Sequence, residues 1–198
     1  MGLKISSLAE FPNIAAKNYY IYFLDYGWED AFSEAMHINF DRMAQAASKN
    51  KSVIISGLNR EHFANEVLSW YEINGEKTAA LLPAIMITNT SPSDLKKLNT
   101  DMESDLKNKK SQPIHNMIII PLKKICNSPS DVTDLMNKIT RDMEENKHIN
   151  NFEVKKFLDK TKIGLSEMVI LKPSIGGVGI DLVKAYQLGK KYWNKIKP

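Results

Sequence analysis

The spacing of apolar residues changes several times along the chain, and each change marks a predicted element. Residues 19–25 read YYIYFLD, a run of aromatic and aliphatic side chains that favours a β-strand. From Trp28 to about Asn50 the apolar residues recur at helical spacing, which predicts a long amphipathic helix. Residues 52–56 read SVIIS, a continuous apolar run typical of a strand covered on both faces. A second helical pattern includes Phe63 and ends at the Asn74–Gly75 pair.

The same alternation continues in the second half of the chain. Residues 81–88 (LLPAIMIT) predict a strand entered through Pro83, and residues 117–122 (MIIIPL) predict another. The tetrapeptide SPSD occurs at 91–94 and again at 128–131. Each copy offers a capping serine, a proline suited to the first helical position and an aspartate for the positive first turn. Each copy therefore predicts the start of a helix.

Strands and helices thus alternate four times before the pattern changes. Such an alternation predicts an α/β fold with a central, mostly parallel sheet of four or five strands and helices on both faces. We expect this α/β domain to span residues 1–150. Residues 151–198 are expected to form a C-terminal extension that ends in an amphipathic helix from Ile180 to Ile196.

The first half of the chain resembles the thioredoxin-like fold in the order of its elements. The resemblance rests on FLDYGWEDAF at 23–32 and on LLPAIMI at 81–87, and it covers residues 17–146. It implies that Pro83 is the cis-proline before the third strand of that family. The family's redox motif falls at residues 27–30, which read GWED, and thiol–disulfide exchange needs cysteine there. A flavodoxin-like, all-parallel sheet explains the same order and stays open as the alternative.

Composition narrows the class of protein without identifying a substrate. The 198 residues are 43% hydrophobic and 25% charged, which is ordinary for a globular protein with one core. The formal net charge of +4 is too small to argue for nucleic acid, and we expect none as a partner. Cys126 is the single cysteine, which excludes an internal disulfide and a cysteine-based zinc site. We expect no metal, no cofactor and a cytoplasmic location in a bacterium.

Acidic residues follow the end of the strand predicted at 19–25. Ligands of open α/β sheets bind outside the carboxyl ends of the strands, so Asp25 with Glu29 or Asp30 is one candidate catalytic site. Paired carboxylates of this kind hold Mg²⁺, and the alternative function is therefore a small nucleotide- or metal-dependent enzyme. The interpretation that we favour is structural. Glu29 and Asp30 are expected in the first helical turn, where the helix dipole favours negative charge, with Asp25 as a turn or capping group.

The predicted helix at 180–196 is the most suggestive binding feature. It combines an apolar stripe with four lysines, and a fifth lysine follows directly at position 197, a pattern that docks in a partner's groove or lies on an anionic membrane surface. The residues that we expect to contact a partner are Tyr186, Lys190, Lys191 and Trp193. The favoured function is a non-catalytic protein-binding or adaptor module in a bacterial multi-component assembly. Membrane-surface docking through this helix is a further alternative.

Overall fold

The computed structural model describes residues 1–70, 81–94 and 117–154, and these residues contain a five-stranded sheet. The strands are β1 (Gly2–Ile5), β2 (Tyr19–Leu24), β3 (Ser52–Gly57), β4 (Ala84–Thr88) and β5 (Met117–Pro121). Their order across the sheet is β1-β3-β2-β4-β5. The pairs β1–β3 and β3–β2 are parallel, whereas β4 runs antiparallel to both β2 and β5.

This topology confirms the α/β class and shows that the sheet is mixed. Among the described strands β4 alone runs opposite to the other four, so an all-parallel, flavodoxin-like sheet does not describe this arrangement. The reason is that a strand buried on both faces shows the same continuous apolar run whichever way it points. Residues 84–88 and 117–121 are buried throughout, and their sequence therefore carries no sign of direction.

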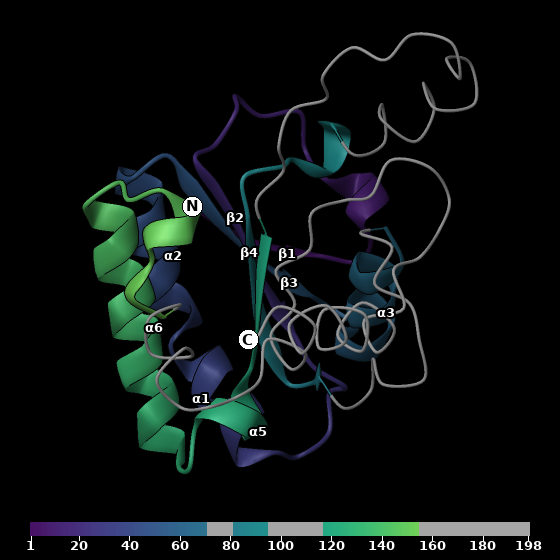
Figure 1. The fold of residues 1–198 in the computed structure, drawn as a ribbon. Coiled ribbons are helices and arrows are strands. Elements are labelled where there is room, and N and C mark those ends of the chain that lie inside the picture. The colour runs from purple at the N-terminus through teal and green to yellow at the C-terminus, as the bar shows by residue number, and fades with distance from the viewer. Residues whose placement is uncertain (71–80, 95–116, 155–198) are drawn as a thin grey trace, which may run out of the picture.

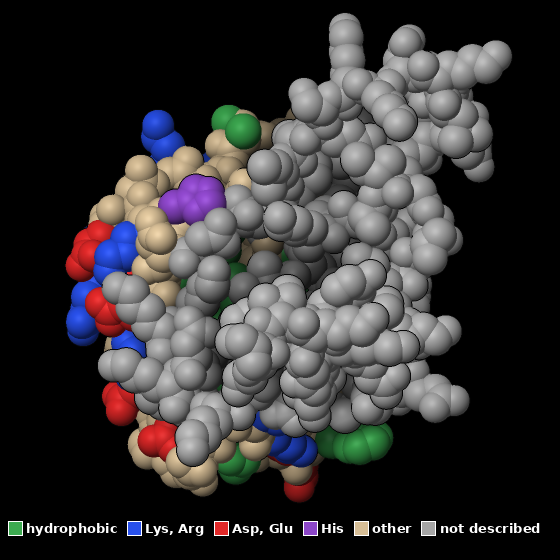
Figure 2. Space-filling model, in the orientation of Figure 1, with side chains coloured by type: hydrophobic (Ala, Val, Ile, Leu, Met, Phe, Trp, Pro, Cys, Tyr) green, Lys and Arg blue, Asp and Glu red, His purple; other side chains and the backbone are tan. Residues whose placement is uncertain are grey.

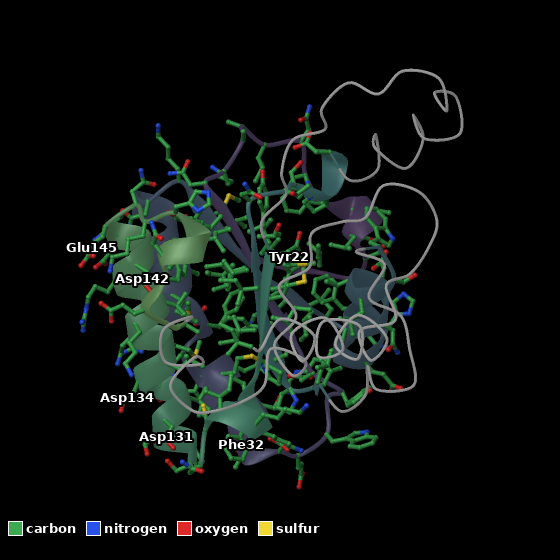
Figure 3. The ribbon with its side chains drawn as sticks, viewed as in Figure 1. Tyr22, Phe32, Asp131, Asp134, Asp142 and Glu145 are labelled. Atoms are coloured by element: carbon green, nitrogen blue, oxygen red, sulfur yellow. The ribbon has the colours of Figure 1, made fainter. Side chains whose placement is uncertain are left out.

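Helices cover both faces of the sheet (Figure 1). One face is covered by α1 (Ala31–Ile38), α2 (Phe40–Lys49) and α6 (Pro129–Glu144), and the other by α3 (Arg60–Trp70). The side chains of β2 alternate between the two cores: Phe23 packs with Met36 and Phe40, whereas Tyr22 packs with Phe63. Figure 3 places Tyr22 in the middle of the sheet, between the two helical layers.

The helix predicted from Trp28 to Asn50 is divided in two at Asn39. This residue is buried, and its side-chain amide donates to the Ala35 carbonyl at 2.8 Å and to Thr133 Oγ1 of α6 at 3.2 Å. An asparagine that bonds to backbone four residues earlier competes with the regular helix ladder. The interruption therefore divides the segment into α1 and α2, and both helices contribute side chains to the same core cluster.

Strand β1 was not predicted from the sequence. It is four residues long and pairs with β3 from Gly2 to Ile5. A segment this short does not show a recognisable alternation of apolar and polar residues. A Cβ added at Gly2 would lie 2.7 Å from Ala44 Cβ and 2.9 Å from Phe40 Cε1. Glycine at this position therefore allows α2 to pack directly on the edge strand.

Both predicted helix starts have the expected caps where they are described. Ser128 caps α6, with a reciprocal contact from Asp131 to the Ser128 backbone N–H at 3.0 Å. Ser91 Oγ accepts a bond from the Asp94 backbone N–H at 3.0 Å. Pro83 immediately precedes β4, as predicted, and the Leu82–Pro83 peptide bond is cis. Directly after β5, Leu122–Ile125 forms the short helix α5.

The last residues that the structure describes pack in the core of the α/β domain. Ile149, Phe152 and Val154 are buried with the cluster under α6, where the ring of Phe152 lies edge-on to Tyr19 at 5.3 Å. Residues 155–198, which include the predicted C-terminal helix, lie outside the described residues. Within the described ranges, no helix has the length and apolar character needed to cross a membrane.

Candidate functional site

The turn that follows β2 is built around the carboxylate of Asp25. Asp25 is only 2% exposed, and its Oδ1 accepts a hydrogen bond from the backbone N–H of Gly27 at 2.7 Å. An aspartate that bonds to the backbone two residues later forms an Asx turn. Gly27 has φ +74°, a conformation that glycine adopts without strain. The predicted turn-forming role of Asp25 is therefore confirmed.

Two side chains of α1 complete the surroundings of Asp25. Ser33 Oγ donates to Asp25 Oδ2 at 2.5 Å, and His37 Nε2 lies 2.5 Å from the same oxygen. Four residues separate Ser33 from His37, so both side chains lie on the same face of the helix. The buried carboxylate thus links the end of β2, the turn and α1 in a single polar cluster.

Opposing effects act on the pKa of Asp25. Burial is the largest and would raise the pKa, but hydrogen bonds from His37 and Ser33, the charge attraction of His37 and the Gly27 N–H together lower it below its usual value. Asp25 is therefore ionised at neutral pH. Both of its oxygens are already engaged by donors of the protein itself, which suits an internal anchor better than a metal ligand or a general base.

Asp30 is the N-cap of α1 and not, as predicted, a first-turn residue. Its Oδ1 accepts from the backbone N–H groups of Phe32 at 3.0 Å and Ser33 at 3.2 Å, and its Oδ2 pairs with Lys123 of α5. Burial would raise the pKa of Asp30, yet these hydrogen bonds and the charge of Lys123 lower it. The helix begins at Ala31 because Asp30 is extended, and Glu29, which is exposed, therefore lies outside the helix as well.

A stacked aromatic pair, of which Trp28 is exposed and Tyr26 is partly buried, lies at this anchored turn. The rings of Tyr26 and Trp28 stack with centroids 5.3 Å apart and an interplanar angle of 27°. Tyr26 also packs on the α3-side core, whereas Trp28 is 72% exposed. Leu58, at the end of the neighbouring parallel strand β3, is 65% exposed. Parallel neighbours end at the same edge of a sheet, so both loops project from one edge.

Arg60 connects the two loops. It is the first residue of α3, and a Cβ added at Gly27 would lie 3.5 Å from Arg60 Cβ. Its Nη1 lies 3.9 Å from Asp25 Oδ2. Hereafter, the strand-end surface means the group formed by Tyr26, Trp28, Leu58 and Arg60. By contrast, Figure 2 shows interspersed acidic and basic side chains over α6, as on an ordinary solvated face.

The structure brings two of the predicted site residues to the same residue of α1. Asp25 accepts from the Ser33 hydroxyl and Asp30 accepts from the Ser33 backbone N–H, whereas Glu29 is exposed. In the part of the chain that is described, no three His, Cys, Asp or Glu side chains form a metal-binding group. His37 was not predicted as a partner of Asp25. The available signal was a serine and a histidine four positions apart on the predicted helix.

The four positions predicted to bind a partner are outside the described residues: Tyr186, Lys190, Lys191 and Trp193. Cys126 is 5% exposed, and burial raises the pKa of its thiol to about 11, with a further contribution from the charge of Asp131. A thiol with so high a pKa is a poor nucleophile at neutral pH.

Comparison with known proteins gave no relative for this chain. A scan of protein-family models, a search of curated proteins and a search of solved structures each returned no match.

Proposed function

We propose that this chain is a non-catalytic protein-binding module and that the strand-end surface is its binding site. The observation that carries the proposal is the exposed Trp28, stacked on Tyr26 and held on a turn that the buried Asp25 fixes. Tryptophan and arginine are enriched among the residues that dominate binding energy at protein interfaces. A rigid turn also lowers the entropic cost of ordering these side chains on binding.

The contacts of the carboxylates favour a binding module over the enzyme alternative. A metal site or an acid–base pair needs carboxylate oxygens directed at the ligand. Asp25 directs its oxygens to Gly27, Ser33 and His37, and Asp30 directs its oxygens to a helix start and Lys123. The acids therefore stabilise the turn, and the side chain that faces the solvent is Trp28.

We further propose that the domain is a thioredoxin-like module without redox chemistry. Strand β2 leads into α1 and α2, strand β3 leads into α3, and Pro83 precedes β4, in the order that the resemblance implied. The antiparallel pairing of β4 with β5 also agrees with the closing strands of that family. At the position of the family's redox motif this chain has Gly27 to Asp30, where Trp28 offers an exposed apolar side chain and no thiol is present.

Affinity purification followed by direct titration tests the binding function. The full-length chain would be used to isolate partners from the source organism, and each candidate would then be purified and titrated against the wild-type chain and two variants. Trp28→Ala should weaken binding by about 30-fold, the effect of a hot-spot residue contributing about 2 kcal/mol. Ile38→Ala is the matched control, because Ile38 is 73% exposed on α1 and lies outside the strand-end surface. Equal affinities for all three proteins would disprove the proposed site.

A further inference from the structure

Arg60 is held in place without using its hydrogen-bonding capacity. Its side chain is 41% exposed, and its one ion pair in the described part of the chain is the 3.9 Å approach to Asp25. That distance is too long for a hydrogen bond. Asp25 Oδ2 already accepts from Ser33 and His37, both at 2.5 Å, so it has little capacity left for the guanidinium.

The position of Arg60 suits recognition of a carboxylate. Its stem lies against the turn at Gly27, and its five N–H donors form a rigid planar fork. A carboxylate brought against the exposed side of this fork would form two parallel, charge-assisted hydrogen bonds with it. Because Asp25 is close behind, it also keeps the guanidinium directed at this edge of the sheet.

The other charged side chains on this edge of the sheet indicate that an acidic partner would be recognised by a direct ion pair and not by a net positive potential. Lys123 is paired with Asp30, and Lys124 is exposed beside it. Glu29 and Glu61 are exposed and carry the opposite charge, and Glu61 contributes with burial to raising the pKa of Tyr26. Only when Arg60 is counted with Lys124 do the exposed cations named here equal the two exposed glutamates, so selectivity for an acidic partner must come from direct contact with Arg60.

We infer that the partner presents an Asp or Glu side chain to Arg60, next to an aromatic or large aliphatic side chain that packs on Trp28. This inference rests on the proposed function, because it uses the same strand-end surface. It specifies the partner's chemistry: an acidic residue adjacent to an apolar one in a protein segment. The apolar contact supplies most of the affinity, and the ion pair supplies selectivity.

A phage-displayed library of random peptides, selected on the immobilised full-length chain, tests this inference. Wild-type protein should enrich peptides with Asp or Glu beside an aromatic or large aliphatic residue. Arg60→Glu should lose the acidic preference and favour Lys or Arg instead. Arg141→Glu is the matched control, because Arg141 is exposed on α6, outside the strand-end surface, and should select the same peptides as wild type. Titration of an enriched peptide should show about tenfold weaker binding to Arg60→Gln than to the wild type. This second variant still tests the inference if Arg60→Glu does not fold.

The outcomes separate this inference from the proposed function. Peptide enrichment that Trp28→Ala abolishes, but that shows no acidic preference and no response to Arg60→Gln, would overturn the inference and leave the proposed function standing. Absence of enrichment on wild type, or enrichment that Trp28→Ala leaves intact, would overturn both. Arg60→Lys keeps the charge and loses the planar fork, so we expect it to bind the peptide more weakly than wild type and more tightly than Arg60→Gln.

Discussion

Replacing Asp25 by asparagine should destabilise the fold substantially although it barely changes side-chain volume. Three donors reach the carboxylate: Gly27 N–H, Ser33 Oγ and His37 Nε2. Hydrogen bonds to charged groups contribute about 1.5–3 kcal/mol each, against about 0.5–1.5 kcal/mol for neutral pairs. A loss of about 1 kcal/mol at each of three bonds lowers the free energy of unfolding by about 3 kcal/mol. The asparagine amide also offers N–H groups where the protein supplies donors, which forces Ser33 or His37 to reorient.

Urea denaturation at neutral pH measures this change directly. The unfolding midpoint of Asp25→Asn should fall while the slope m stays constant, since both proteins expose the same surface on unfolding. Asp134→Asn provides the control, because Asp134 is exposed on α6 and points away from the sheet in Figure 3. Its effect should stay within about 0.5 kcal/mol. If Asp25→Asn costs as little as this control, the carboxylate is not the anchor of the turn.

The same variant isolates a pH dependence. The pKa of Asp25 is lower in the folded protein than in the unfolded chain, where it is about 3.9. The ionised carboxylate therefore stabilises the fold above the unfolded-state pKa, and this stabilisation is lost as the pH falls through the folded-state pKa. The stability difference between wild type and Asp25→Asn should thus be present above the unfolded-state pKa of Asp25 and should shrink as the pH falls below about 4. A difference that persists unchanged into strong acid would show that charge is not its origin.

Three further predictions concern the rest of the fold. Ser128→Ala removes the N-cap of α6 and should lower the free energy of unfolding by about 1 kcal/mol in urea titrations; an unchanged midpoint would mean that the cap contributes nothing. Gly57→Ala should lower the free energy of unfolding by about 1–3 kcal/mol and lower the melting temperature, because the new Cβ would lie 2.2 Å from Phe63 Cβ. A melting temperature equal to that of the wild type would contradict this packing. Cys126 should react slowly with iodoacetamide in the native protein and quickly in urea, and the chain should not reduce insulin. Fast labelling of the native protein would show that the thiol is not buried and inert. Sustained insulin reduction that Cys126→Ser abolishes would show the same.

The sequence by itself determined those features that depend on neighbours within a few residues. The apolar runs at 19–24, 52–56 and 117–121 are strands because continuous apolar stretches bury both faces of a sheet. The two SPSD segments start helices because a serine hydroxyl reaches a backbone N–H three residues later. The glycine turn after Asp25 is equally local. Such contacts form from short segments and are therefore visible in the order of residues.

Tertiary structure alone decided which distant residues meet. The division of the first helix depends on Asn39 reaching Thr133, 94 residues away, and the N-cap Asp30 is held by Lys123 from a different strand end. The direction of β4 and the pairing of β1 depend on which strands lie beside them. His37 becomes the partner of a buried carboxylate because α1 packs back over the end of β2. Hydrophobic periodicity records how much of a side chain is buried and on which face, but it does not record which side chains share the space once the elements pack.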